Sequence, residues 1–243
     1  MNGNIEYRME KEKTLFTTNH LSFTSRKYFL HLSILFMTVL FVNDSVVYKL
    51  VNVFGYSISA ASFVFPITYT ILDIVAEVYG YRAAKQIIWL SVIFNFIFSG
   101  LIRLLLILPS PSSWTGEEAY RFVFDKALLI PTTYLIAMPI GALINTYLIS
   151  KWRVLVQGKY FVIRSIASSA IGEFVFTVIA VLIIWNFRVV NVDLVKFIFI
   201  TYMTKPLCTI FTAFPATLIV KILKNVEGID MYSPKTTSFS PVN

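Results

Sequence analysis

The chain has 243 residues, of which 57% are hydrophobic and only 14% are charged, and its formal net charge is +8. Soluble domains carry roughly 25% charged residues, so this composition, with a mean hydropathy of +0.72, excludes an ordinary soluble protein. The basic residues lie between apolar runs, where they orient a membrane protein. We therefore expect a chain that contacts the lipid bilayer and does not bind nucleic acid.

Six apolar runs predict an all-α, polytopic membrane protein with six transmembrane helices. The runs are bounded by charged residues, Pro or Gly, and several reach the ~20 residues that cross a hydrocarbon core of about 30 Å. In chain order the predicted helices span about residues 28–50, 57–79, 83–108, 122–149, 161–186 and 195–223. They form one predicted domain, 28–224, between polar tails at 1–27 and 225–243, and residues 109–121 are predicted to form a loop.

The basic residues also predict the orientation of the chain. When the segments between the predicted spans are assigned alternately to two sides, one side holds fourteen Lys and Arg residues and the other holds five. The positive-inside rule places the richer side in the cytoplasm. Both termini are therefore expected to be cytoplasmic, in agreement with the even number of spans.

Six charged residues stand out among those inside the predicted spans, where an ionised side chain near the bilayer centre costs about 2.5 to 3.5 kcal/mol on insertion scales. Each of them needs a charged partner, a wet cavity or neutralisation. The six residues are Asp44, Asp73, Glu77, Arg103, Glu173 and Lys205.

Asp73 and Glu77 are four residues apart and share one helix face with Tyr69. We expect this face to line a polar cavity, because two like charges one turn apart are costly in lipid. The alternative for Glu77 is a position near the cytoplasmic interface, paired with Arg82 or Lys85.

The remaining buried charges are predicted beside features that alter helix packing. Glu173 follows small residues in SSAIGEFVF, which permit close helix approach, and Lys205 directly precedes Pro206. Pro66 can likewise break the helix that carries Asp73. Lys205 either neutralises a buried acid or meets a substrate, and the sequence leaves both alternatives open. Asn145 either bridges helices or lines the cavity.

The sequence contains no P-loop, no HExxH zinc motif, no GxSxG motif and no plausible Cys and His pair, and its single cysteine is Cys208. We therefore expect no enzyme activity, no cofactor and no metal site. A buried carboxylate suits a guanine-like ring, because two adjacent N–H donors on the ring edge match its two oxygens. Aromatic residues would then stack on the ring.

The run FPITYTILDIVAEVYGYRAAKQIIW, residues 65–89, resembles the signature of the queuosine precursor transporter family, also called the vitamin uptake transporter family. The resemblance covers about residues 43–223. Further matches are Asn145, Gly158, Lys159, Tyr160, Arg164, Ser168, Gly172, Glu173, Tyr202, Lys205 and Pro215. The chain departs from many members in carrying Phe176 where they have Asp, and Ala142 where they have Gln.

The resemblance implies a multi-pass protein of the bacterial inner membrane that imports a 7-deazaguanine base for tRNA modification. The expected cargo is 7-cyano-7-deazaguanine, 7-aminomethyl-7-deazaguanine or queuine. The expected substrate-binding residues are Asp73, Glu77, Glu173, Lys205, Tyr202, Tyr69 and Asn145.

Three interpretations of these residues are kept open. The first is a transporter that works alone by alternating access, with proton exchange at one acid as a further hypothesis. The second is the substrate-binding membrane subunit of an ATP-driven uptake complex for vitamins or nucleobases. The third is a structural protein whose buried charges only pair helices. The oligomeric state, the driving ion and the choice among deazapurines are left open.

Overall fold

A computed structural model describes residues 26–53, 55–124, 129–186 and 194–228. Six helices in these residues are long and apolar enough to cross a membrane, which confirms the predicted all-α, six-span fold. The six are α2 (Phe29–Val46), α3 (Ala61–Tyr79), α4 (Tyr81–Leu106), α6 (Leu129–Leu155), α7 (Phe161–Asn186) and α8 (Leu194–Glu227). A short helix, α5 (Glu117–Phe124), and two strands, β1 (Leu50–Val53) and β2 (Tyr56–Ser59), complete the described elements.

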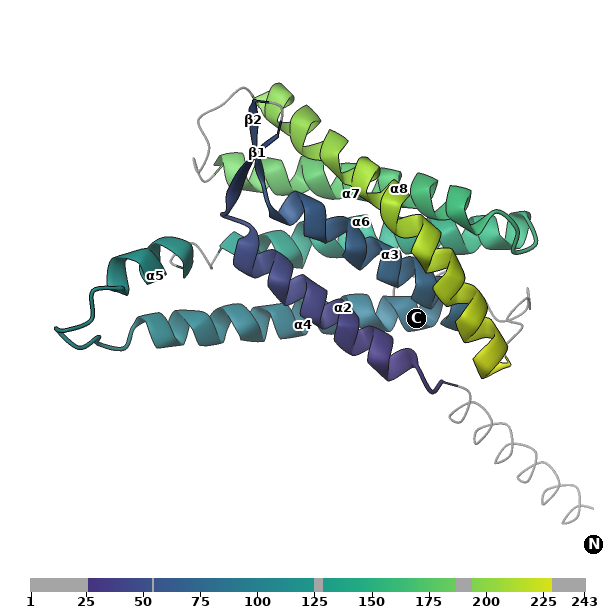
Figure 1. Ribbon diagram of the computed structural model, residues 1–243, viewed down its shortest axis with the longest axis horizontal. Coiled ribbons are helices and arrows are strands. Elements are labelled where there is room, and N and C mark those ends of the chain that lie inside the picture. Colours follow the sequence, from purple (N-terminus) through teal and green to yellow (C-terminus); the bar gives the residue numbers. More distant parts are fainter. Residues whose placement is uncertain (1–25, 54, 125–128, 187–193, 229–243) are drawn as a thin grey trace, which may run out of the picture.

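Helix α3 forms the centre of the bundle. It packs against α2, α4, α6, α7 and α8, and Figure 1 shows it running between them. Within its apolar window 83% of the residues are buried, against 28 to 50% in the other five spans. The helix that carries the sequence signature is therefore shielded from lipid by its neighbours, which is where polar side chains in a membrane protein can be satisfied.

The two ends of the described chain lie at the same end of the bundle (Figure 1). The backbone N–H of Tyr28 donates to a carboxylate oxygen of Glu227 at 3.0 Å, and the hydroxyl of Tyr79 donates to the same oxygen at 2.6 Å. This arrangement follows from an even number of spans. The assignment of this end to the cytoplasm stays a prediction, and most of both predicted tails lies outside the described residues.

A β-hairpin replaces helix where the first and second spans were expected to extend. Helix α2 ends at Val46, and β1 pairs antiparallel with β2 from Leu50 opposite Ser59 to Val53 opposite Tyr56. The predicted boundaries at residues 50 and 57 are therefore wrong. The stretch is apolar enough to pass for helix, but Gly55 takes a φ of +85°, a conformation that suits a turn between strands.

The segment between α4 and α6 also differs from the prediction. The expected loop, residues 109–121, contains the start of α5, where Arg121 pairs with Glu117 and donates to the carbonyl of Leu106 at 2.7 Å. The fourth span begins at Leu129 and ends at Leu155, so the predicted bounds of 122 and 149 are both too early. The apolar residues of α5 were wrongly counted as the start of that span.

Prolines do not interrupt the helices that carry the buried charges. Helix α3 continues through Pro66 and α8 continues through Pro206, so the predicted breaks are wrong. A proline removes one backbone hydrogen bond, and a transmembrane helix packed between neighbours tolerates that loss. The chain does turn at Gly80, the single residue between α3 and α4, whose φ of +87° permits the sharp change of direction.

Candidate functional site

The three acids expected at the site are all buried, but the structure places them in three different environments. Asp73 and Glu77 lie on α3 and Glu173 lies on α7, and none of the three is more than 1% exposed. Because a buried carboxylate needs compensation, the partners of each acid indicate what it does.

The carboxylate of Asp73 is held by three donors from two helices. Asn145 on α6 donates to Oδ1 at 2.8 Å, and Ser165 and Ser169 on α7 donate to Oδ2 at 2.5 and 3.1 Å. The two serines lie one helical turn apart and therefore face α3 together. Asp73 thus joins three helices, with hydrogen bonds on both of its oxygens.

Two glycines bring α6 and α7 into close contact beside Asp73. A Cβ atom on Gly172 would lie 2.7 Å from the carbonyl oxygen of Gly141 and 2.8 Å from Cβ of Asn145. The hydroxyl of Tyr69 lies 3.4 Å from the carbonyl oxygen of Gly172, so α3 fits against the same crossing. Close approach through small residues is the packing mode that the segment before Glu173 predicted.

The carboxylate of Glu173 is only partly satisfied. Its Oε1 accepts from the hydroxyl of Thr209 at 3.1 Å. Its Oε2 is buried, and no group in the described residues hydrogen-bonds to it. The ammonium of Lys205 donates to the hydroxyl oxygen of Thr177 at 2.8 Å, and that hydroxyl donates to the backbone carbonyl of Glu173 at 2.7 Å. Glu173 and Lys205 are therefore linked through Thr177, each with hydrogen-bonding capacity to spare.

Two aromatic rings lie against the ammonium of Lys205. Its Nζ atom is 4.8 Å from the ring centroid of Phe65 on α3 and 4.6 Å from that of Phe176 on α7. The two rings stack with centroids 4.2 Å apart and an interplanar angle of 24°. Both contacts are within the range of cation–π attraction, which stabilises the charge of a lysine that is only 4% exposed.

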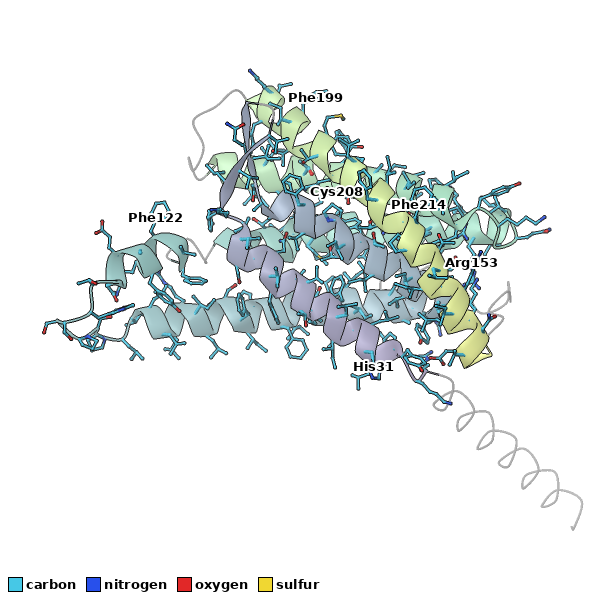
Figure 2. All side chains as sticks on the ribbon, in the orientation of Figure 1. His31, Phe122, Arg153, Phe199, Cys208 and Phe214 are labelled. Atoms are coloured by element: carbon cyan, nitrogen blue, oxygen red, sulfur yellow. The ribbon has the colours of Figure 1, made fainter. Side chains whose placement is uncertain are left out.

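Glu77 is surrounded by cations. Arg164 on α7 donates to Oε2 at 3.0 Å, Lys224 on α8 donates to Oε1 at 2.7 Å, and Nε of Arg153 on α6 lies 3.7 Å from Oε1. The sequence interpretation had named Arg82 and Lys85 as interfacial partners, whereas these three cations come from distant helices. Figure 2 shows Arg153 at the end of the bundle where α8 finishes. The ion cluster therefore closes the bundle near the chain ends.

Arg164 also braces the turn between α6 and α7. Its Nε donates to the carbonyl of Lys159 at 2.9 Å, and its Nη2 donates to that of Gly158 at 3.3 Å. The backbone of this turn is left-handed at Gln157, Gly158 and Tyr160, with φ between 53° and 74°. One guanidinium thus fixes a strained turn and compensates Glu77, which gives a physical reason for the sequence matches at this turn.

The other polar residues singled out in the sequence lie outside this arrangement or support it. Tyr202 donates to the backbone carbonyl of Ala170 at 3.2 Å, so its hydroxyl contacts α7 about one turn before Glu173. Asp44 accepts from the amide of Asn95 and joins α2 to α4. Asp44 therefore belongs to a separate polar contact.

Sequence reasoning missed several partners of the acids, although their spacing carried a signal. On α7, polar residues recur at every fourth position, at 165, 169, 173 and 177, and on α3 the same spacing joins residues 65, 69, 73 and 77. Every-fourth-residue spacing places side chains in one stripe. The missed partners of the acids are Arg153, Ser165, Ser169, Thr177, Thr209 and Lys224, and Phe65 was missed as a neighbour of Lys205.

Comparison with known protein families gives one match. The family model described as "putative vitamin uptake transporter" matches residues 59–220. No curated protein and no solved structure matches the chain. The matched region contains Asp73, Glu77, Glu173 and Lys205, and most of the six membrane-spanning helices. The chain is therefore a multi-pass membrane protein that belongs to the vitamin uptake transporter family.

Proposed function

We propose that this transporter imports a 7-deazaguanine base, a precursor of queuosine, across the bacterial inner membrane. The observation that carries the proposal is the unpartnered, fully buried Oε2 of Glu173, a residue whose backbone carbonyl is linked through the hydroxyl of Thr177 to the buried ammonium of Lys205. Oε2 of Glu173 lacks a hydrogen-bond donor, and the ammonium of Lys205 has N–H groups to spare. These two groups favour a ligand that offers one or more donors and an acceptor on the same edge.

The lactam edge of a guanine-like ring has this pattern. It presents a ring N–H and an amino group side by side, next to a carbonyl oxygen. Glu173 would accept the two N–H bonds and Lys205 would donate to the carbonyl. The hydroxyl of Thr209 lies 3.1 Å from Oε1 of Glu173 and 3.2 Å from the backbone carbonyl of Lys205. Its single hydrogen can serve that carbonyl instead, which would leave both oxygens of Glu173 for the base.

The other expected site residues have supporting roles in this proposal. Asp73, Asn145 and Tyr69 hold α3 against the crossing of α6 and α7, next to the turn of α7 that carries Glu173. Tyr202 steadies α7 from α8. Glu77 ties together the end of the bundle where the chain ends meet.

Burial of Glu173 and Lys205 implies that the helices must separate to admit and release the base. We infer alternating access, in which the ion cluster of Glu77 opens on one side of the membrane. Exchange of a proton at one buried acid would couple uptake to the proton gradient. Collapse of that gradient should then lower uptake, and undiminished uptake would remove this part of the proposal.

We further propose that both termini are cytoplasmic, and that the chain acts without an ATP-hydrolysing partner, a cofactor or an enzymatic step. The test is uptake of labelled 7-cyano-7-deazaguanine, 7-aminomethyl-7-deazaguanine and queuine. The host should be unable to make queuosine and should lack ATP-driven modules for vitamin uptake. Uptake that appears only when such a module is supplied would favour a substrate-binding subunit instead.

Two variants and one matched control locate the site in the same assay. At equal abundance in the membrane, Glu173→Gln should abolish uptake, whereas Asp73→Asn, which alters only the packing beside the site, should lower it partly. Glu118→Gln makes the same chemical change at an exposed position of α5 and should leave uptake unchanged. Absence of uptake of all three bases by the unaltered chain would reject the proposed substrate class.

A further inference from the structure

The stacked rings of Phe65 and Phe176 lie next to the hydrogen-bonding groups of the site. Phe176 is three residues from Glu173 on α7, and Phe65 is one turn before Tyr69 on α3. Phe65 is buried, whereas Phe176 is partly exposed. Both rings contact Lys205, whose ammonium is also the proposed hydrogen-bond donor to a ligand at Glu173.

Gly141 on α6 makes room for this stack. A Cβ atom at Gly141 would lie 2.6 Å from the hydroxyl of Tyr69 and 2.9 Å from Cβ of Phe176. Any side chain there would push α6 away from both residues. The close approach therefore sets Phe176 against α3 and brings its ring onto that of Phe65.

Lys205 rests on these rings through contacts that another group can replace. Its ammonium has three N–H donors, and in the structure its hydrogen bond goes to Thr177. The rings contribute electrostatic attraction, which is weaker than a hydrogen bond to a carbonyl when the lysine is charged. A planar base offers a carbonyl to the ammonium and a flat face to the rings. The ammonium and the rings can therefore each exchange their contact with one another for a contact with the base.

We propose that Phe65 and Phe176 form the stacking surface for the transported base, and that Phe176 is a specificity-determining residue. Lys205 lies beside this stacked pair in the empty protein, about equally far from both ring centroids, and moves onto the carbonyl of the base when the ring binds. The inference rests on the proposed function and adds a selection rule to it. The site favours extended flat rings over smaller rings with the same hydrogen-bonding edge, because stacking grows with overlapping area.

The test compares two ligands on the purified, full-length protein. 7-Cyano-7-deazaguanine has two fused rings, whereas isocytosine presents the same lactam edge on a single ring. Phe176→Leu and Phe176→Met keep an apolar side chain without a flat face, and Phe176→Tyr keeps the face. Phe214→Leu is the matched control, because Phe214 is an exposed phenylalanine of α8 (Figure 2).

Base stacking on aromatic side chains sets the expected size of the effect. Phe176→Leu and Phe176→Met should weaken binding of the bicyclic base about tenfold, and Phe176→Tyr should change it less than about twofold. Isocytosine should lose only about threefold in the same two variants, since it overlaps less of the ring. Phe214→Leu should bind both ligands like the unaltered protein.

The outcomes separate this inference from the proposed function. Unchanged affinity for the bicyclic base in Phe176→Leu and Phe176→Met would overturn the stacking role while leaving the substrate class intact. An equal loss for both ligands would also overturn it, because a general disturbance of the site does not distinguish ring size. Failure of the unaltered protein to bind the bicyclic base would reject the proposed function itself.

Discussion

Glu77 and Glu173 are chemically identical and equally buried, yet their surroundings are opposite. Glu77 lies within 4 Å of three cations from α6, α7 and α8. Glu173 has one hydroxyl donor and one oxygen with no hydrogen-bond partner in the described residues. The first acid therefore joins helices, and the open oxygen of the second supports the proposal that Glu173 binds the ligand.

The two residues differ because a buried carboxylate without hydrogen-bond partners costs free energy. A buried carboxylate whose bonds are complete stabilises the fold only while its partners stay in place, and removing one partner is costly. A carboxylate with a missing partner lowers the stability of the empty protein, and a bound ligand recovers that loss. Stability and ligand binding should therefore separate between the two residues.

The largest expected effect on stability comes from Glu77. Glu77→Gln leaves buried Arg164 without its carboxylate and should lower the free energy of unfolding by about 3 kcal/mol or more. Thermal unfolding of the purified protein in detergent measures the change. Lys224→Met, at the more exposed partner, should have a smaller effect. An unchanged Tm in Glu77→Gln would break the contrast between the two glutamates.

A second effect comes from the glycine crossing that positions Glu173. Gly172→Ala places a methyl group 2.7 Å from the carbonyl oxygen of Gly141 and should destabilise the protein by about 1 to 3 kcal/mol. Gly100→Ala is the control, because a Cβ at Gly100 meets nothing within 4 Å. Equal unfolding temperatures for these two variants would show that close packing of α6 on α7 does not position the site.

Asp73 sharpens the comparison, because its two oxygens already have partners. Asp73→Asn removes an acceptor from Ser165 and Ser169 and should lower the free energy of unfolding by about 1 to 3 kcal/mol. The dissociation constant for the base should change less than about threefold, which is a smaller change than the loss of one hydrogen bond to a charged group would cause. Loss of binding with an unchanged Tm would make Asp73, instead of Glu173, the acid that holds the base.

The smallest effect is expected outside the six membrane-spanning helices, at Glu117 of α5. A hydrogen bond from Ser110, and then the guanidinium of Arg121, hold the pKa of Glu117 below its usual value. Its contribution is therefore present above the ordinary pKa of a glutamate and is lost as pH falls through the lowered pKa. Because these groups are at the surface, Glu117→Gln should shift Tm by less than about 1 °C at neutral pH. A Tm shift as large as that of Glu77→Gln would show that burial does not explain the difference between Glu77 and Glu117.

The sequence predicted the transmembrane architecture well because apolar length is a strong signal. The fifth span was predicted at 161–186, and α7 has these bounds. The hairpin after α2 was missed because its residues are nearly as apolar as the spans beside it. Helix α5 was missed because its first half is charged and was predicted as loop, whereas its apolar end was predicted as the start of the next span. Hydropathy alone does not distinguish a short strand or an interfacial helix from the end of a span.

The site was predictable only in part, for a different reason. Asp73, Glu77 and Glu173 stood out because charges are rare in apolar runs. Apart from Asn145, most of their partners did not, because they lie far away in the sequence: Arg164 is 87 residues from Glu77 and Lys224 is 147 residues from it. Which acid is satisfied depends on helix packing, which the spacing of one sequence does not specify.

The opposite roles of Glu77 and Glu173 can be measured side by side. Equilibrium binding of labelled 7-cyano-7-deazaguanine and thermal unfolding would be recorded on the same preparations of the unaltered protein, Glu173→Gln and Glu77→Gln. Glu173→Gln should weaken binding at least about 100-fold, because it loses a charged acceptor for two N–H donors. Its Tm should stay the same or rise, because an unpartnered buried charge is removed. Glu77→Gln should have a lower Tm and should still bind the base below its unfolding temperature. Tight binding by Glu173→Gln would contradict the account.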